Sequence, residues 1–247
     1  MPGRVRALVR RPSPRLDQGI VTYRERIPLD AELALAQWEA YVAALAAAGF
    51  ETIELDPADG CPDGVFVEDV LVVRDGIAIV TRPGSPARRA ETASAEAAAR
   101  ELGLDTRRIE PPATLDGGDV LQVGSTLYVG VGGRTNRAGA AALGELLGTG
   151  VIEVPLEGVL HLKSAFTALP DGTVVGLAGP GPFESFLPVP EESGAHVVVL
   201  GADSVLLAAD CPVSAGLFAA RGFEPLVVDI SEFQKLEGCV TCLSVLL

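Results

Sequence analysis

Short apolar runs of β-strand type alternate along this chain with longer, alanine-rich segments of helical periodicity. The first cycle begins with the run at residues 4–10, which prolines end, and continues with a helix that Asp30 can cap and Gly49 can terminate. A second short run, residues 51–55, completes the cycle. The pattern predicts strand, helix and strand in succession, which is typical of an α/β protein.

The cycle recurs at residues 5–55, 77–110, 127–155 and 204–229, with a shorter copy at 173–189 in which prolines disfavour a long helix. Further runs precede the later copies, at 65–73, 118–123, 162–169 and 196–200, and the run that holds Cys242 would complete the unit that the N-terminal strand begins. Repeats of roughly 45 residues are typical of propellers and solenoids.

We therefore predict one catalytic domain, residues 1–247, built as a five-bladed, pseudo-symmetric α/β propeller of repeated ββαβ units. One loop from each unit would reach a common centre. A doubly wound α/β sheet is the alternative, and the hairpins that interrupt every crossover argue against it.

Composition limits the partners and the compartment. Hydrophobic residues make up 48% of the chain, which is enough for a large core. The formal net charge of −14 argues against a nucleic-acid partner and mildly favours a cationic substrate. The cysteines do not form a disulfide-scaffold pattern, and neither a signal segment nor a membrane-spanning run is present. These features predict a protein of the reducing cytoplasm with no membrane contact.

Two acidic clusters stand out. Asp63, Glu68 and Asp69 lie in or beside the run at 65–73, which we expect to be a strand, so that Glu68 and Asp69 point to opposite faces. A buried carboxylate is costly unless it is paired, so this cluster indicates an ion pair with an arginine or, as we favour, a site for a cationic ligand. Asp116 and Asp119 flank two glycines that allow a positive φ or a close backbone approach, although a plain acidic turn would also explain that motif.

Cysteine and histidine provide further candidate chemistry. Cys239 and Cys242 form a CxxC motif, but a strand-like segment follows it, whereas redox motifs of this kind begin a helix. A structural zinc site needs more ligands than the scattered cysteines and histidines offer. A single nucleophilic thiol at Cys242, assisted by a histidine and an acid, fits better. His161, at the start of the β-like segment 161–169, competes with His196 for the role of acid/base catalyst.

Six motifs resemble those of a known family. In chain order they read FVEDVLVV, TRPGSPARR, LDGGDVL, GRTNRAG, HLKS and EGCVTCLSVL. Together they are similar to the dimethylarginine dimethylaminohydrolases of the guanidine-modifying superfamily, whose fold is the five-bladed pentein propeller. The resemblance covers almost the whole chain and agrees with the repeat count.

The resemblance implies a role for each motif residue. It implies that Cys242 is the nucleophile, His161 the general acid/base and Asp116 the carboxylate that orients His161, with Asp119 as structural support. The implied substrate-binding residues are the acids, the two arginines that hold the α-carboxylate, and the residues lining the pocket: Asp63, Glu68, Asp69, Arg88, Arg134, Leu16, Phe66 and Leu236.

The resemblance also implies the reaction. Cys242 would attack the guanidinium carbon of Nω,Nω-dimethyl-L-arginine or Nω-monomethyl-L-arginine, and His161 would protonate the departing amine and then activate water, releasing L-citrulline. No metal or organic cofactor is implied, although zinc could bind Cys242 and His161 as an inhibitor. Arginine deiminases carry an acid two residues after the catalytic histidine, whereas this chain has Lys163, which favours a methylated arginine over free arginine.

Other interpretations stay open at this point. The same nucleophile would serve an arginine deiminase-like or amidinotransferase-like enzyme. The chain could instead be a non-catalytic ligand-binding pentein, or hold zinc through Cys239, Cys242 and His161. The sequence does not distinguish a monomer from a homodimer, and we expect the irregular residues 25–29 to form a mobile lid over the pocket.

Overall fold

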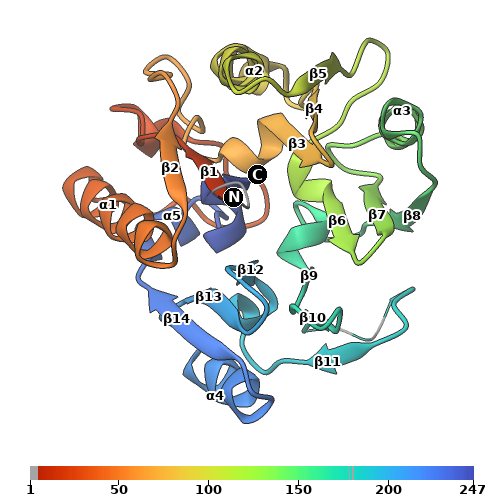
Figure 1. Cartoon of the computed structure of the whole chain (residues 1–247). Helices are drawn as coiled ribbons and strands as arrows, with labels where there is room; N and C mark the ends of the chain where they lie inside the picture. The colour runs from red at the N-terminus through yellow and green to blue at the C-terminus, as the bar shows by residue number, and fades with distance from the viewer. Residues whose placement is uncertain (1–4, 178, 180) are drawn as a thin grey trace.

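Five three-stranded sheets surround a common centre in the computed structural model, which describes residues 5–177, 179 and 181–247 (Figure 1). In each sheet the middle strand pairs antiparallel with one neighbour and parallel with the other. The prediction of a five-bladed α/β propeller of ββαβ units is confirmed. Arg4, where the predicted first strand begins, lies outside the described residues.

The strand that lines the central cavity is called the inner strand here, and it comes first in each blade. In that order the blades are β15 (Val245–Leu246), β1 (Arg6–Val9) and β2 (Glu51–Glu54); β3 (Leu71–Arg74), β4 (Ile77–Val80) and β5 (Asp105–Arg108); β6 (Val120–Val123), β7 (Thr126–Val131) and β8 (Val151–Pro155); β9 (Phe166–Ala168), β10 (Val174–Gly176) and β11 (Phe186–Pro188); and β12 (Val198–Val199), β13 (Ser204–Ala208) and β14 (Glu224–Val228).

Helices connect the middle strand to the outer strand in four blades and lie at the periphery (Figure 1). They are α1 (Ala31–Ala47), α2 (Thr92–Glu101), α3 (Arg137–Leu147) and α4 (Pro212–Ala220), and the short α5 (Ser231–Gln234) follows β14. The predicted ends of α1 are confirmed: the Asp30 carboxylate accepts the N–H groups of Glu32 and Leu33, and Gly49 has φ 95°. In the fourth blade the described residues between β10 and β11 form no helix, as the prolines there predict.

A 3₁₀ turn precedes every inner strand, and here the predicted strands at 65–73 and 161–169 were partly wrong. The five turns are Val67–Val70, Gly117–Asp119, Leu162–Ser164, Glu192–Ala195 and Val240–Leu243. Apolar β-branched residues favour a strand locally, but a strand needs a partner. Leu71 pairs with Val80 at the end of β4, and among the described residues the pairing continues past it only through the Thr81 N–H, which donates to the Val70 carbonyl at 3.2 Å. The Cys242 segment is likewise a turn, and its strand begins only at Val245.

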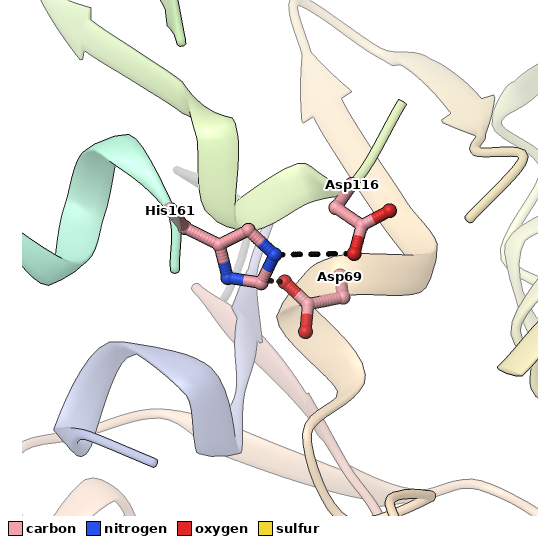
Figure 2. A group of neighbouring side chains, drawn as sticks. All are labelled: Asp69, Asp116 and His161. Carbon is pink, nitrogen blue, oxygen red and sulfur yellow. Dashed lines mark hydrogen bonds and ion pairs between the residues drawn. The ribbon is translucent and has the colours of Figure 1, made fainter. Parts of the chain in front are cut away.

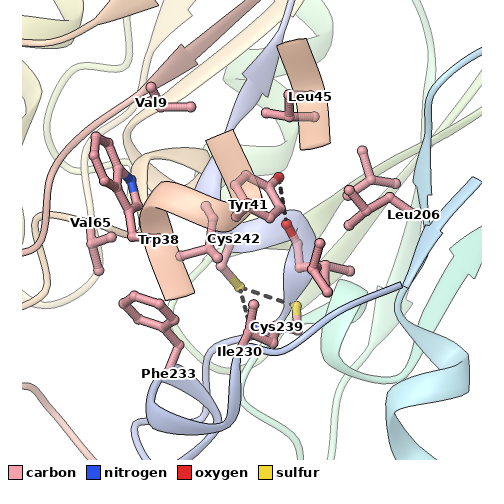
Figure 3. Close-up of a cluster of buried hydrophobic side chains, with 14 of the residues drawn as sticks. Val9, Trp38, Tyr41, Leu45, Val65, Leu206, Ile230, Phe233, Cys239 and Cys242 are labelled. Carbon is pink, nitrogen blue, oxygen red and sulfur yellow. Dashed lines mark hydrogen bonds between the residues drawn. The ribbon is translucent and has the colours of Figure 1, made fainter. Parts of the chain in front are cut away.

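The chain closes on itself in the first blade, where β15 pairs with β1 through Ala7 opposite Leu246 and Leu8 opposite Val245. The preceding turn is anchored on α1, because the Tyr41 hydroxyl donates to the Val240 carbonyl at 2.9 Å and contacts Ser244 Oγ at 2.8 Å. Tyr41 belongs to a buried cluster that also contains Cys242 (Figure 3). Within the described part of the chain no helix has the length and apolar character required to cross a bilayer.

Candidate active site

The 3₁₀ turns bring the predicted catalytic residues from different blades to the centre of the molecule. Asp69 lies within the first turn, Asp116 and His161 stand immediately before the second and third, and Cys242 lies within the last. Because the turns occupy equivalent places in the repeated unit, residues far apart in the sequence become neighbours. The expected convergence of loops on one centre is therefore observed.

His161 lies between two carboxylates (Figure 2). Its Nε2 atom is 3.1 Å from Asp116 Oδ2, and its Nδ1 atom is 3.6 Å from Asp69 Oδ1. Burial opposes a charge on the imidazole, which is 3% exposed, but the carboxylates of Asp69 and Asp116 outweigh burial and raise the pKa of His161 to about 9. At neutral pH His161 is an imidazolium that can donate a proton. The other candidate, His196, instead donates to the Ser164 carbonyl.

Two hydrogen bonds, one to its carboxylate and one from its backbone N–H, fix Asp116 beside His161. Asp116 Oδ1 accepts the Gly84 N–H at 2.8 Å, and the Asp116 N–H donates to Thr135 Oγ1. The Thr135 hydroxyl then donates to Asp119 Oδ2 at 2.6 Å. The other Asp119 oxygen accepts the N–H of Leu162, the residue after His161. Asp119 thus ties together the turns that carry Asp116 and His161.

Glycine is required in this motif for space. A Cβ atom on Gly118 would lie 2.7 Å from both Asp69 Oδ1 and His161 Nδ1, and one on Gly117 would lie 2.0 Å from the Glu68 carbonyl oxygen. Both distances are far below van der Waals contact. Of the two reasons that the sequence offers for these glycines, close backbone approach is therefore the one that applies.

Cys242 is 8% exposed, and its sulfur lies 3.2 Å from the sulfur of Cys239 (Figure 3). The hydrogen bond with Cys239, burial, and the nearby charges of Glu68 and Asp69 raise the pKa of the Cys242 thiol. The thiol is therefore protonated before a substrate binds. A guanidinium bound in front of it would offset the carboxylates and favour the thiolate.

One small cavity joins most of the predicted site residues. His161 and Cys242 line it together with Asp63, Phe66, Asp69, Arg88, Arg134 and Leu236. Its volume is about 20 Å³, which is room for about one water molecule, so a substrate of arginine size requires the walls to separate.

Four further lining residues were not predicted: Ile20, Leu160, Glu237 and Gly238. Leu160 directly precedes His161, and Glu237 and Gly238 directly follow Leu236. Their position beside predicted site residues could have identified them as lining residues. Ile20 lies in an irregular segment and carried no such signal.

The two predicted arginines differ in their contacts. Arg88 is buried and forms ion pairs with Asp69 and Glu91. It also donates to the carbonyl oxygens of Asp63 and Phe66, so protein partners occupy its guanidinium. Arg134 is engaged less closely, with Nη2 3.3 Å from the Thr22 hydroxyl and Nη1 4.0 Å from Asp116 Oδ2.

The two predicted acids on this wall also differ. Burial would raise the pKa of Asp69, but the charges of His161 and Arg88 outweigh burial and lower it to about 2. Asp63 Oδ1 accepts the N–H of Ile20 at 2.9 Å, and burial raises the pKa of Asp63. Asp69 is therefore an anion at neutral pH, available to a cationic ligand.

Glu68 and Leu16 lie away from this cavity. The Glu68 carboxylate accepts the Lys163 ammonium at 2.6 Å and the Thr241 hydroxyl at 2.8 Å. Burial raises the pKa of Glu68 to about 7, against the opposing effect of Lys163. Leu16 is packed in a hydrophobic cluster shared by the first and fifth blades.

Glu68, Lys163 and Thr241 face a second cavity of about 530 Å³, which residues of the five inner strands line. Glu68 and Asp69 thus do point to opposite sides, as predicted, although a turn and not a strand carries them.

Asp69, Asp116 and His161 also offer three possible metal-ligand atoms within 4.8 Å of one another. Both imidazole nitrogens face carboxylates, and the raised pKa keeps the ring protonated. A metal ion would have to displace that proton, so this group favours proton transfer over metal binding.

The chain is 60% identical over 247 residues to the N(G),N(G)-dimethylarginine dimethylaminohydrolase of Streptomyces coelicolor, and the match covers 97% of this chain and 96% of that protein. The chain belongs to the dimethylarginine dimethylaminohydrolase family. A second dimethylarginine dimethylaminohydrolase, from Pseudomonas aeruginosa, is 33% identical over 247 residues, covering 96% of this chain and 97% of the relative. No protein-family model matches the chain.

Solved structures of dimethylarginine dimethylaminohydrolases share the fold. A cysteine-to-serine mutant from Pseudomonas aeruginosa, complexed with citrulline, has a TM-score of 0.91 at 31% identity and covers 98% of both chains. A histidine-to-glycine dimethylarginine dimethylaminohydrolase in adduct with S-methyl-L-thiocitrulline has a TM-score of 0.92 at 30% identity, covering 99% of this chain and 100% of that one. The pentein fold implied by the six motifs is thereby confirmed.

Proposed function

We propose that this chain hydrolyses Nω,Nω-dimethyl-L-arginine and Nω-monomethyl-L-arginine to L-citrulline and the corresponding methylamine. The supporting observation is that Cys242 and a protonated His161 line one buried cavity with carboxylates and arginines. An amino acid with a cationic side chain matches this lining, because its cation can face the carboxylates and its α-carboxylate can face an arginine. Membership of the family, and the citrulline complex of a relative, support this substrate class.

Substrate binding follows from the charges that line the cavity. Asp69 and Asp63 would face the guanidinium, and Phe66 and Leu236 would pack against the aliphatic stem. Arg134 is the better candidate to hold the α-carboxylate, because Arg88 is already held by Asp69, Glu91 and two backbone carbonyls. In this proposal Arg88 keeps Asp69 ionised and contributes its remaining positive charge. Glu68 and Leu16 support the walls from behind, without contact to the substrate.

The proposed chemistry has two stages. The bound cation favours the Cys242 thiolate, which attacks the guanidinium carbon; His161 then protonates the departing amine and a thiouronium intermediate remains on sulfur. His161, now neutral, takes a proton from water, whose attack on the same carbon releases citrulline and restores the thiol. Asp116 holds the ring in place through both stages.

Nucleophile and acid/base catalyst both belong to the chain in this proposal, so no metal or organic cofactor takes part. Zinc bound to Cys242 and His161 would remove both residues from the reaction, which makes it an inhibitor. Position 163 supports the methylated substrate, because it holds a lysine where a deiminase has an acid for the free guanidinium. The Lys163 ammonium itself is paired with Glu68 at the second cavity, outside the proposed substrate site.

Citrulline release tests the proposal, with dimethylarginine, monomethylarginine and free arginine as substrates. We expect turnover of both methylated substrates, weak or no turnover of free arginine, and loss of activity in Cys242→Ser. Cys61→Ser, which changes a thiol outside the cavity, is the matched control and should retain activity. Preference for free arginine would favour the deiminase alternative, and inertness toward every guanidine would contradict the proposal.

A further inference from the structure

Cys239 and Cys242 face each other across one tight turn (Figure 3). The Cys242 N–H donates to the Cys239 carbonyl at 3.1 Å, which closes the turn, and residues three apart stack on one side of such a turn. The Cys239 N–H points to the Cys242 sulfur at 3.4 Å, and the two sulfurs are 3.2 Å apart. The sequence predicts a strand after the CxxC motif, which disfavours redox chemistry; the structure has a 3₁₀ turn that Cys239 caps.

We propose that Cys239 and Cys242 are a disulfide-forming pair, in which Cys239 resolves the oxidised form of Cys242 after reaction with a hydroperoxide. The Cys242 thiol first loses its proton, the thiolate attacks a peroxide oxygen, the O–O bond breaks, and the departing oxygen takes up a proton. A sulfenic acid and one molecule of water (an alcohol for an organic peroxide) result. The Cys239 sulfur then attacks the Cys242 sulfur, the S–O bond breaks and water leaves. In sum, two thiols and one hydrogen peroxide give one disulfide and two waters.

The geometry assigns different parts to the two sulfurs. Cys242 lines the cavity through which a small oxidant can arrive, whereas Cys239 lies behind it, 5% exposed and in contact with the Thr241 hydroxyl at 3.3 Å. The sulfurs need only approach from 3.2 Å to the roughly 2.0 Å of a disulfide bond. The remaining thiols are elsewhere: Cys211 donates to the Ala208 carbonyl in the fifth blade, and Cys61 lies in a loop before the first 3₁₀ turn.

A disulfide here would block the nucleophile reversibly and protect it from irreversible oxidation to sulfinic acid. The block on activity rests on the proposed function, but the disulfide itself does not. Mass spectrometry therefore tests the pair even if the chain hydrolyses no guanidine.

Tryptic peptides separate the thiols cleanly. Cleavage after Lys235 places Cys239 and Cys242 together in residues 236–247, with Cys61 in residues 27–74 and Cys211 in residues 164–221. The folded protein is treated with hydrogen peroxide, then denatured and alkylated with iodoacetamide before digestion. We expect the 236–247 peptide to be unalkylated and lighter by two hydrogen atoms, and to become alkylated at both cysteines when dithiothreitol precedes the alkylation. Activity should fall and recover in parallel.

Cys239→Ser removes the resolving thiol, and Cys239→Ala is the second variant should the hydroxyl disturb folding. In either variant we expect the 236–247 peptide to gain two or three oxygen atoms, and activity, measured against the untreated variant, not to return with dithiothreitol. Cys61→Ser and Cys211→Ser are the controls and should behave as the wild type. The proposal is overturned if the wild-type peptide gains oxygen as the variants do, or if both its cysteines stay alkylatable after peroxide.

Discussion

His161 retains its proton at neutral pH because carboxylates flank both of its ring nitrogens. This environment determines its first task, since a protonated imidazole can donate to a leaving amine but cannot act as a base until that proton is gone. Burial lowers the pKa of His161, but the negative charge of the neighbouring carboxylates raises it by more, so that the pKa is about 9. The state of one ring therefore sets the order of the two proposed stages.

Asp116→Asn tests this description of His161. The change removes the charge that Nε2 faces and offers an amide that can present a donor to the ring, so the ring loses both its orientation and part of its raised pKa. We expect kcat to fall by roughly a hundredfold or more. The loss of kcat/KM at alkaline pH, expected near pH 9 in the wild type, should move to lower pH. Asp105→Asn at the surface is the control. If the alkaline loss of kcat/KM occurs at the same pH in Asp116→Asn as in the wild type, the role assigned to Asp116 is contradicted.

The motif residues around Cys242 and His161 were predictable because they belong to short, distinctive sequence patterns. Glu68 shows where such reasoning fails. Its pattern matches a substrate-binding acid, yet its carboxylate is held by Lys163 and Thr241 on the far side of the turn. Which of two adjacent acids lines the cavity that holds Cys242 and His161 depends on partners of Glu68 that are 95 and 173 residues away in the chain. No local pattern encodes those contacts.

The helices and strands, too, were predictable only where a local pattern determines them. The order of strands and helices was predictable because glycines, prolines and caps mark each unit, and α1 and its Asp30 cap are examples. The 3₁₀ turns were not predictable, because a run rich in β-branched residues such as 65–73 suits a strand equally well. Their form depends on where pairing with the neighbouring strand ends, and the register of β3 and β4 decides this.

Glu237 fixes the irregular segment that borders the cavity. Its carboxylate accepts the backbone N–H groups of Thr22, Tyr23 and Arg24, and Glu237 itself has a positive φ of 61°. A non-glycine residue in this region carries strain, which the three hydrogen bonds help to offset. The predicted lid at 25–29 therefore begins directly after an anchored stretch.

Glu237→Gln should release this anchor. An amide presents one acceptor where the carboxylate presents two, and its NH₂ group repels the backbone N–H groups. We expect KM to rise roughly tenfold, equivalent to about 1.4 kcal/mol, with a smaller change in kcat. Limited proteolysis within residues 19–29 should quicken and be slowed by citrulline less than in the wild type. Glu25→Gln, a nearby exposed carboxylate, is the control; equal behaviour of the two variants would contradict the anchor.

At the scale of the whole molecule, several buried groups make the folded state bind more protons than the unfolded chain. The pKa of Glu68 rises from 4.5 to about 7, that of Asp119 from 3.8 to about 6 and that of His161 from 6.5 to about 9. Each shift means that the unfolding free energy falls as the pH rises through the interval between the two values. The lowered pKa of Asp69 acts oppositely, because its contribution is lost as the pH falls from 3.8 toward 2.

We therefore expect the unfolding free energy to be greatest near the acidic end of the usual range, about pH 4 to 5, and to decline toward pH 9. The His161 contribution is complete below pH 6.5 and lost by about pH 9, and is on the order of 3 kcal/mol. Urea titrations across this range measure the decline. His161→Asn should flatten the curve between pH 6.5 and 9, and Glu68→Gln between pH 4.5 and 7. A stability that rises with pH between 5 and 9 would contradict these shifts.

The pairing of β1 with β15 has a consequence for synthesis. A ribosome releases β1 and β2 early, yet the inner strand of their blade and the turn that carries Cys242 emerge only after the four other blades have been made. Until then the first blade has an open edge and the future pocket lacks Cys242, the proposed nucleophile. Completion of the ring and arrival of this sulfur are one event, so under the proposed mechanism a nascent chain cannot carry out guanidine chemistry before it has closed.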